Sequence, residues 1–422
     1  MKQETLALHF GYDYDLQRTI SVPIYQNTAY SFESLNQAAA RFALEELGNI
    51  YSRLTNPTVD ILQRRLSKIE GGEFAVCVAS GSAALFYALL NCAQAGDCIL
   101  YSNKIYGGSN TLIAHTLKRF AVNAIEFDID DLDNLEKLID KNVKAIFFES
   151  LSNPQLAIAD IEKITKIAKK HKIITICDNT VATPYLLRPF EYGVDIVIYS
   201  LSKYTNGQGS TLGGAIIERK NLNEFIKNNE RYLAFNSPDE SYHGLIYSEL
   251  TLPNFSIRII LEWLRNTGAS LSANSAWILL QGLETLSLRI KKHSQNALLV
   301  AEFLNKNENV LSVNYPALKD NFYNPLFKKY FKDNNASGLL SFEAKSFEAA
   351  KRICERLKLF ILAANLGDSK SLIIHPASTT HSQLSQNELK KAGISPASLR
   401  LSIGIEDADD LIADLAQALK GE

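Results

Sequence analysis

The sequence predicts an α/β fold around a mostly parallel, seven-stranded sheet, and three observations lead to this prediction. Between about residues 74 and 217, short apolar runs alternate with longer amphipathic segments. The apolar runs hold almost no polar residues, as is typical of strands buried on both faces of a parallel sheet. The longer segments carry apolar residues at helical spacing. A parallel sheet with helices on both faces satisfies all three observations.

The first part of the chain, residues 1–62, has a different pattern. It is irregular and rich in Tyr, Gln, Asn and Thr, and Pro23 and Pro57 interrupt its extended stretches. Proline removes a backbone donor and is poorly tolerated inside regular elements. The sequence therefore predicts an N-terminal arm over residues 1–62.

The predicted large domain, residues 63–262, contains the sheet. Ser82–Ala93 and Ile161–His171 are two of the helices predicted between strands. The seven predicted strands are Phe74–Ala79, Asp97–Tyr101, Asn123–Asp128, Val143–Glu149, Lys172–Cys177, Val194–Tyr199 and Gly214–Glu218.

A smaller C-terminal α/β domain is predicted over residues 263–422. Its apolar spacing predicts two helices, Ser272–Gln281 and Leu286–Lys306. Three strands follow, at Leu339–Phe342, Leu372–Ile374 and Ser398–Ile403.

The charge balance favours a small-molecule substrate over a nucleic acid. The chain has 422 residues, 46% of them apolar, and its 44 basic and 46 acidic side chains give a formal charge of -2. This balance provides no basic surface for a polyanion. We expect neither a nucleic-acid partner nor a membrane partner.

Cysteine usage and hydropathy predict a soluble, cytoplasmic protein. The five cysteines are odd in number and show no Cys-x-x-Cys spacing, which argues against a disulfide framework. Met1–Phe10 has no apolar signal segment, and no apolar run approaches the roughly 18 residues that a membrane span requires.

Two groups of residues raise the question of a metal site. Acidic residues open a predicted helix, Leu132–Ile139, where they would favour its N-terminal dipole, so we interpret them as capping residues. His375 and His381 have no carboxylate or cysteine at a ligand spacing. We predict no metal. The acidic residues are Asp128, Asp130, Asp131 and Asp133.

A lysine and an aspartate lie at the ends of two predicted strands. Lys203 follows the strand that leads to Ser200, and Asp178 follows the strand that ends at Cys177. In parallel sheets, ligands bind at the carboxyl ends of the strands. An amine for the aldehyde and an acid for the ring nitrogen are the two groups that pyridoxal phosphate requires.

Small and hydroxyl-bearing residues supply a candidate phosphate pocket. The turn Ala79–Ala83 joins a strand to a helix, and its Gly81 allows an anion to approach the backbone closely. Alone, such a turn serves helix packing equally well, but Ser200 and Ser202 add hydroxyl groups. Gly207, Gly209, Gly213 and Gly214 match neither a Walker loop nor a dinucleotide fingerprint.

Tyr106 is a candidate for stacking on a planar cofactor. It follows a predicted strand and precedes Gly107 and Gly108. Its ring has the flat face that such stacking needs. A core tyrosine is the alternative interpretation.

Taken in order, these motifs resemble the Cys/Met-metabolism family of pyridoxal-phosphate enzymes across essentially the whole chain. Within the family the resemblance is greatest to the O-acetylhomoserine sulfhydrylases, because of Ala364–Leu372 and Ile374–His381. The shared motifs are Tyr51-Ser52-Arg53, Asn56-Pro57-Thr58, Ser80-Gly81, Tyr106-Gly107-Gly108, Glu149 with Asn153-Pro154, Asp178-Asn179-Thr180, Ser200 to Lys203 and Leu399-Arg400-Leu401-Ser402.

The resemblance implies a fold and a set of cofactor contacts. The large domain would have the aminotransferase-like fold of pyridoxal-phosphate enzymes. Lys203 would carry the cofactor and move protons, with help from Tyr106. Asp178 would pair with the ring nitrogen, and Asn153 would bind the ring hydroxyl. The phosphate would be held by Gly81, Ser82, Ser200 and Ser202.

The resemblance also implies substrate contacts and a composite site. Arg400, inside an apolar run, would clamp the substrate carboxylate with help from the backbone near Asn365. Tyr51 and Arg53 would reach the active site of a neighbouring subunit, Arg53 at the phosphate and Tyr51 at both phosphate and substrate. A homo-oligomer follows, and the family usually forms tetramers built from dimers.

Three positions narrow the implied activity. Methionine γ-lyases carry a cysteine where Gly108 stands, and lyases and cystathionine synthases usually carry Ser-Leu-Gly in place of Asn365–Gly367 and a glutamate near Lys370. The expected reaction is γ-replacement on O-acetyl-L-homoserine by sulfide or a small thiol, in methionine and cysteine biosynthesis. A cystathionine γ-synthase or γ-lyase is the closest alternative. A non-catalytic binding module is the alternative from another class.

Overall fold

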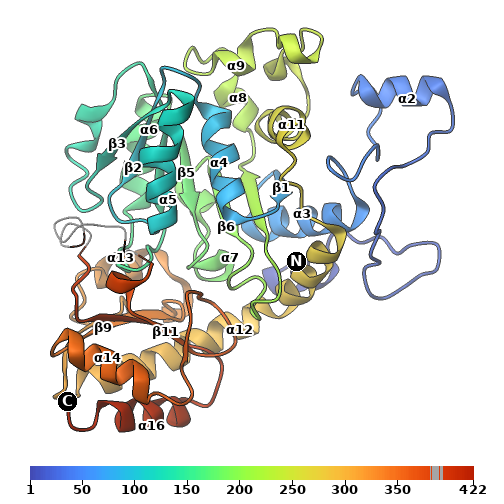
Figure 1. Cartoon of the computed structure of the whole chain (residues 1–422). Coiled ribbons are helices and arrows are strands. Elements are labelled where there is room, and N and C mark those ends of the chain that lie inside the picture. The colour runs from blue at the N-terminus through green and yellow to red at the C-terminus, as the bar shows by residue number, and fades with distance from the viewer. Residues whose placement is uncertain (381, 383–388, 390–392) are drawn as a thin grey trace.

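A computed structural model describes residues 1–380, 382, 389 and 393–422, and it has the predicted α/β fold (Figure 1). The seven strands of the large sheet follow the order β1-β7-β6-β5-β4-β2-β3. Only β7 runs antiparallel to its neighbours. The strands are β1 Phe74–Val78, β2 Cys98–Ser102, β3 Asn123–Phe127, β4 Val143–Glu149, β5 Ile174–Asp178, β6 Ile196–Ser200 and β7 Gly214–Glu218, which confirms all seven predicted strands.

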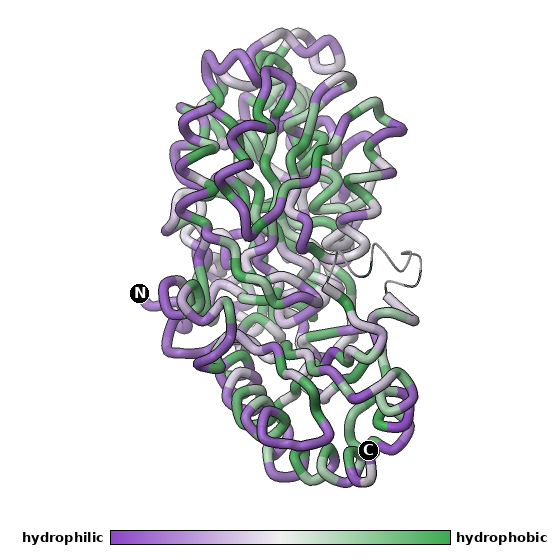
Figure 2. The backbone as a smooth tube through the Cα atoms, turned by 90° about the vertical axis from the view of Figure 1, so that its left-hand side faces the viewer, coloured by the Kyte–Doolittle hydropathy of each residue, from purple (hydrophilic) through white to green (hydrophobic). Residues whose placement is uncertain are grey.

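Helices cover both faces of this sheet, and each strand contributes alternate residues to each face. In β1, Ala75 and Cys77 pack on the side of α3 (Pro57–Glu70), and Val76 and Val78 pack on the side of α4 (Gly81–Cys92). Figure 2 shows hydrophobic residues concentrated along the central strands and hydrophilic ones at the periphery. The remaining helices of this region are α5 Gly107–Thr111, α6 Ile161–Lys170, α7 Thr183–Leu186, α8 Leu222–Ile226, α9 Leu233–Asn236, α10 Asn254–Arg258 and α11 Arg265–Thr267.

The second sheet belongs to the C-terminal part of the chain. Its strand order is β10-β11-β12-β9-β8, and all pairs are antiparallel except β10 with β11. Helices α12 and α14 pack against its strands, and α16 packs against both of these helices. The elements are α12 Ala273–Asn305, β8 Val310–Asn314, α13 Asn324–Tyr330, β9 Leu339–Ala344, α14 Phe347–Arg356, β10 Ile361–Leu362, β11 Leu372–Ile374, β12 Ser398–Ser402 and α16 Ala408–Leu419.

The two helices predicted at the start of this domain are a single helix, so that prediction is wrong. Helix α12 continues for 33 residues through Gly282. A side chain at Gly282 would overlap the backbone oxygens of Thr205 and Asn206. The glycine therefore allows α12 to pack closely against the loop that follows Lys203. It does not end the helix.

The prediction of a helix after the acidic stretch is also wrong. In place of the predicted helix Leu132–Ile139, the structure has one short 3₁₀ turn, Leu135–Leu138. Two of the acids pair with distant basic residues instead of capping a helix, since Asp130 binds Lys104 and Asp133 lies 2.6 Å from Lys163 Nζ.

The N-terminal arm begins on the body and then leaves it. Helix α1 (Gln3–His9) buries Leu6 and Ala7 against α3 and α12. The chain that follows, including α2 (Leu35–Phe42), extends to one side of the large sheet (Figure 1), and the Tyr242 hydroxyl donates to the backbone oxygen of Phe42 at 2.7 Å. Both predicted domain boundaries fall inside helical segments. Residue 62 lies within α3, and residue 262 lies within the π-helical segment Ile259–Leu264.

In the part of the chain that the structure describes, no helix has the length and apolar character needed to cross a membrane.

Candidate active site

Three neighbouring strands end in polar residues at the same edge of the large sheet. Strand β4 ends at Glu149, β5 at Asp178 and β6 at Ser200. Glu149 and Asp178 are paired in the register of the two parallel strands. The carboxyl ends of these strands form the ligand-binding edge of such a sheet, and Lys203 follows in the turn after β6.

The two carboxylates favour a positively charged partner. Glu149 is buried and accepts hydrogen bonds from the backbone N–H groups of Tyr106 (2.6 Å) and Asn153 (3.0 Å). Burial raises the pKa of Glu149 well above its ordinary value, and the charge of Asp178 raises it further. Burial likewise raises the pKa of Asp178, although hydrogen bonds from Thr180 oppose the rise. A protonated ring nitrogen would supply the positive charge.

Lys203 is held with its amine directed at Asn365, in the C-terminal part of the chain. Its Nζ donates a hydrogen bond to Asn365 Oδ1 at 2.8 Å. Burial lowers the pKa of Lys203, and the charge of Arg400 lowers it further. A lowered pKa increases the fraction of neutral, nucleophilic amine.

Arg400 presents a positive charge to the same region. It lies in β12 and is only 5% exposed. One terminal nitrogen donates to Asn153 Oδ1 at 2.9 Å, and the other donates to the backbone oxygen of Asn365 at 2.7 Å. Its Nε has no hydrogen-bond partner among the described residues. Burial lowers the pKa of Arg400 to about 10, which leaves the guanidinium charged at neutral pH.

Asn365 connects the lysine and the arginine. Its side chain accepts from Lys203 and its backbone accepts from Arg400. The predicted neighbourhood of Lys203, Arg400, Asn153 and Asn365 is thus present as a chain of hydrogen bonds. Asn153 Oδ1 accepts from Arg400, and its NH₂ group can donate to a ring hydroxyl.

The N-terminus of α4 forms a cradle against β6. A Cβ at Gly81 would lie 2.6 Å from the Cβ of Ser200, so only glycine allows this approach. Ser80 caps the helix by accepting from the N–H of Ala83 at 3.2 Å. The exposed Ser82 follows on the first turn. Backbone N–H groups at such a terminus bind anions such as phosphate.

Ser202 is engaged with the backbone beside this cradle. Its hydroxyl accepts from the N–H of Gly213 at 3.0 Å and donates to the Gly213 oxygen at 3.3 Å. Among the predicted phosphate ligands, it is the one with protein partners for its hydroxyl.

Tyr106 lies at the mouth of the site. Its side chain is 44% exposed, so the alternative interpretation as a core tyrosine is wrong. The ring lies against Gly108, where a Cβ would be 2.5 Å from ring atom Cε1. The open side of the ring is free to face a planar molecule.

Tyr51 and Arg53 are not brought to this site within one chain. The Arg53 guanidinium lies 5.3 Å from the centroid of the Tyr51 ring, in the arm. Over the described residues, the structure has no hydrogen bond or ion pair between this pair and Lys203, Asp178 or Arg400.

Two residues of the site were not predicted individually from the sequence. Glu149 ends a strand at the same edge as Asp178, and that signal could have identified it. Thr180 accepts from the Ser200 N–H at 2.8 Å, and its own N–H donates to Asp178 Oδ1 at 2.9 Å. Its place two residues after the strand end gave no separate signal.

Of the two histidines that raised the question of a metal site, His375 and His381, the structure describes the first. His375 forms 2.7 Å hydrogen bonds with the Ser378 hydroxyl and the Pro396 oxygen. His381 lies outside the described residues.

The chain is similar to known proteins over nearly its whole length. The model of the Cys/Met metabolism PLP-dependent enzymes matches residues 4–420. The O-acetyl-L-homoserine sulfhydrylase of Corynebacterium glutamicum is 43% identical over 418 residues, which cover 98% of this chain and 95% of that protein. The homocysteine synthase of Schizosaccharomyces pombe is 39% identical, covering 99% and 98%.

A solved structure is also similar along its full length. A chain from Campylobacter jejuni, assigned as an O-acetylhomoserine (thiol)-lyase, has 68% sequence identity, a TM-score of 0.99 and 100% coverage of both chains. It carries N′-pyridoxyl-lysine-5′-monophosphate at its position 205.

The fold and the site define a pyridoxal-phosphate-dependent enzyme of fold type I. The chain belongs to the Cys/Met metabolism PLP-dependent enzyme family. Its residues fit the cofactor: the Gly81 cradle for the phosphate, the Glu149 and Asp178 carboxylates for the ring nitrogen, and Lys203 for the aldehyde.

Proposed function

We propose that this chain catalyses γ-replacement on O-acetyl-L-homoserine, with sulfide or a small thiol as the nucleophile. The products are acetate and homocysteine, or methionine when the thiol is methanethiol. The observation that carries this proposal is the chain of hydrogen bonds from Lys203 through Asn365 to Arg400, because an amine then lies near a guanidinium that can bind a carboxylate. The names of the relatives supply the acyl substrate.

The cofactor supplies an electron-withdrawing ring for the carbon chain of the bound amino acid. Asp178, with Glu149 beside it, holds the positive charge of the ring nitrogen, and the N-terminus of α4 holds the phosphate. Ser200 and Ser82 border that terminus. Lys203 binds the aldehyde, and a lysine in this role is supported by the pyridoxyl-lysine that the Campylobacter chain carries at its position 205.

Lys203 is the base that moves protons. Its lowered pKa provides a neutral amine, and its four-carbon stem lets Nζ reach more than one carbon of the substrate. Two protons, from the α- and β-carbons, must leave before acetate departs, and two must return after the nucleophile adds. Tyr106, at the mouth of the site, assists in this transfer.

Arg400 selects an α-amino acid. Its Asn153 and Asn365 contacts fix the guanidinium, and each terminal nitrogen keeps a second N–H group that can donate to a carboxylate. The buried positive charge, which forms no ion pair within the described chain, favours an anionic ligand.

A second member of the same family, a cystathionine γ-synthase or γ-lyase, would use the same residues. Gly108 favours the sulfhydrylase, since the Tyr106 ring occupies the space of any larger side chain there. The non-catalytic alternative is disfavoured because the chain retains Lys203, Asp178 and Arg400.

The test is a steady-state assay of the holoenzyme with O-acetyl-, O-succinyl- and O-phospho-L-homoserine, each with sulfide and with cysteine. We expect the highest kcat/KM for the acetyl ester with sulfide. A higher value for the succinyl ester with cysteine would identify a cystathionine synthase instead.

We also propose that the arm completes the active site of a second copy of the chain, in a tetramer built from dimers. Large apolar side chains of the arm are nearly fully exposed, among them Leu16 (99%), Ile20 (92%) and Leu35 (86%). Exposed apolar surface of this extent favours a protein partner. Arg53, with its planar fork, would then reach the phosphate of the neighbour, and Tyr51 its substrate.

Subunit mixing tests the composite site. Arg53→Ala and Lys203→Ala chains, each inactive alone, are expected to regain activity when mixed, because one hybrid site has both intact residues. Mixing that exchanges subunits without any regain would show that each site uses one chain only.

The domain division and the compartment remain proposals. We assign residues 1–62 to the arm, 63–262 to the cofactor-binding domain and 263–422 to the small domain. A cytoplasmic location is supported by the cysteines, all five of which are free thiols and four of which are buried.

A further inference from the structure

Three buried polar side chains lie on one face of helix α12, which extends from the large domain to the second sheet (Figure 1). Arg289, His293 and Asn296 follow one another at intervals of four and three residues, which places them on the same side of a helix. Arg289 is 8% exposed, and the other two are fully buried. Buried polar groups need hydrogen-bond partners, and this polar face of α12 finds them in backbone oxygens.

Arg289 binds the turn that follows Lys203. One terminal nitrogen donates to the backbone oxygen of Tyr204 at 2.7 Å, and the other donates to those of Thr205 (3.3 Å) and Gly282 (2.6 Å). Burial lowers the pKa of Arg289 to about 10, so the guanidinium is charged at neutral pH. The last carbonyls of a helical turn have no partners along the chain, and a positive charge is favourable there.

Gly207 makes room for this guanidinium. Its N–H donates to the backbone oxygen of Lys203 at 2.9 Å and closes the turn. Its φ of +75° is in the left-handed region, and a Cβ there would overlap a terminal nitrogen of Arg289. Gly207 matches no nucleotide-binding pattern in the sequence, and its contact with Arg289 accounts for it.

Asn296 binds the segment that follows Arg400. Its NH₂ group donates to the backbone oxygens of Gly404 at 3.1 Å and Glu406 at 2.8 Å, which uses both N–H bonds of the amide. Strand β12, which contains Arg400, ends at Ser402. Asn296 therefore fixes the chain just beyond this strand.

His293 lies between these two residues on α12 and contacts both segments. Its Nδ1 is 2.6 Å from the backbone oxygen of Ile403, and its ring packs edge-on against Tyr204, with centroids 5.3 Å apart. Burial lowers the pKa of His293 to about 4, so the ring is neutral at pH 7. Because a carbonyl oxygen can only accept, the single ring proton is on Nδ1.

We propose that the polar face of α12 positions Lys203 relative to Arg400. The two residues belong to chain segments of different sheets, and α12 contacts the backbone directly after each of them. A displacement of about 1 Å in a reacting group can cost about 100-fold in rate. The inference rests on the roles proposed for Lys203 and Arg400, and its residues act through these two without touching the substrate.

The two ends of the polar face should affect different kinetic constants. Arg289→Met removes the contacts with the Lys203 turn, so kcat should fall by about 10- to 100-fold while KM changes by less than about threefold. Asn296→Leu loosens the segment after Arg400, so KM for the homoserine ester should rise by about tenfold with a smaller change in kcat. The assay uses the ester with the highest kcat/KM, so a different acyl preference leaves this split unchanged and counts only against the proposed function.

Displacement of the cofactor gives a readout that does not depend on turnover. Pyridoxal phosphate can link to Lys203, whereas pyridoxamine phosphate has no aldehyde and cannot. Holoenzyme is titrated with pyridoxamine phosphate, and the loss of the visible absorbance of the lysine-linked cofactor is followed. The concentration for half displacement should fall about tenfold in Arg289→Met and stay within about twofold in Asn296→Leu. General loosening of the fold would weaken both ligands alike and leave this concentration unchanged.

Lys291→Met, on the exposed side of α12, is the matched control and should change neither measurement. If Arg289→Met does not fold, Arg289→Lys decides, because it keeps the charge and can reach one carbonyl. It should give the same pattern with smaller changes. An unchanged displacement concentration in the Arg289 variant, or equal changes of kcat and KM in the Arg289 and Asn296 variants, would assign this face to stability alone and overturn the proposal.

Discussion

Two buried arginines, Arg400 in β12 of the second sheet and Arg258 in α10, are held in nearly the same way. Each donates to an asparagine Oδ1 and to a backbone oxygen, and each leaves its Nε without a partner among the described residues. These hydrogen bonds fix the orientation of both guanidinium groups, so each side chain has little rotational freedom.

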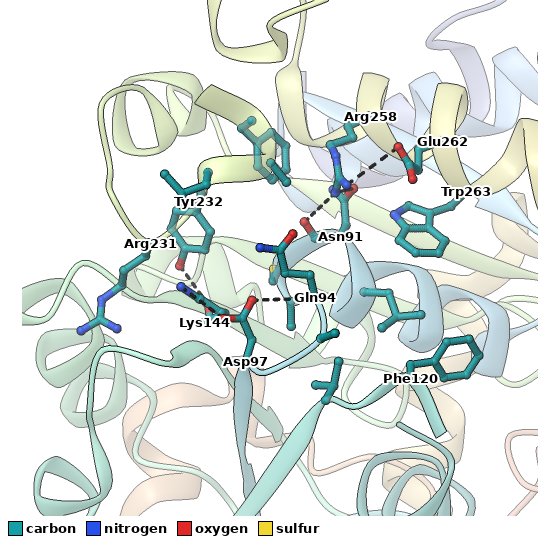
Figure 3. A pocket seen from close by; sticks show the side chains of 18 residues that line it. Asn91, Gln94, Asp97, Phe120, Lys144, Arg231, Tyr232, Arg258, Glu262 and Trp263 are labelled. Carbon is teal, nitrogen blue, oxygen red and sulfur yellow. Dashed lines mark hydrogen bonds and ion pairs between the residues drawn. The ribbon is translucent and has the colours of Figure 1, made fainter. Parts of the chain in front are cut away.

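Their surroundings differ in charge. Arg400 has no carboxylate partner in the described chain and shares its region with the amine of Lys203, whose pKa it lowers. Arg258 has Glu262 at 3.9 Å and two aromatic rings beside it. The difference is consistent with a substrate carboxylate as the anionic partner of Arg400. The charge of Arg258 is already partly balanced by Glu262 (Figure 3).

The largest expected effect is that of Lys203→Ala. Without the amine there is neither a covalent anchor for the cofactor nor a proton carrier, so kcat should fall by at least about 1,000-fold. The visible absorbance of the lysine-bound cofactor should be lost as well. A variant that keeps both the absorbance and full turnover would remove Lys203 from the mechanism.

Arg400→Met should lower kcat/KM by about 100- to 1,000-fold, because it removes a charge-assisted bidentate contact with the substrate. Arg258→Met should lower it far less. Arg352→Met, on the exposed surface of α14, serves as the inert control. Equal losses for Arg400→Met and Arg258→Met would contradict the assignment of the substrate carboxylate to Arg400.

Gly282→Ala tests the packing of α12 against the loop that follows Lys203. Helix propensity alone predicts that alanine stabilises α12 by about 1 kcal/mol. The overlap of a Cβ with the backbone of Thr205 and Asn206 predicts instead a loss of about 2–3 kcal/mol. Urea unfolding decides the sign, with the exposed neighbour Gln281→Ala as the matched control.

The smallest expected effect concerns Glu70, which lies beneath the catalytic edge. The Tyr199 hydroxyl donates to Glu70, and it accepts from Asn179 Nδ2 at 2.7 Å. Burial raises the pKa of Glu70 from 4.5 to about 8. The stability that its protonated form contributes is therefore fully present below pH 4.5 and is lost as the pH rises through about 8.

Glu70→Gln keeps the shape and removes the titration. The free energy of unfolding of the variant should depend less on pH between about 5 and 8 than that of the natural chain, as measured by urea unfolding across this range. Parallel pH profiles for the two proteins would show that Glu70 titrates normally.

Much of the large domain could be predicted because its signals are local. The apolar runs of β1 to β7 mark the strands, and strand ends mark Asp178 and Ser200. The continuity of α12 could not be predicted, since the reason for Gly282 is its contact with Thr205, some 77 residues earlier in the sequence.

The same limit applies to the sites. Lys203 and Asp178 follow strands and are visible in the sequence, whereas the contact of Lys203 with Asn365 spans 162 residues. A cavity of about 300 Å³ next to Arg258 (Figure 3) gave no signal at all, because its lining comes from separate segments whose residues are each ordinary core or surface residues.

The most direct measurement of the central claim is a product balance. Holoenzyme is supplied with O-acetyl-L-homoserine and sulfide, and acetate, homocysteine and 2-oxobutanoate are quantified together. The account predicts equal amounts of acetate and homocysteine, with negligible 2-oxobutanoate. Acetate release matched by 2-oxobutanoate and ammonia, without homocysteine, would show elimination in place of γ-replacement and would contradict it.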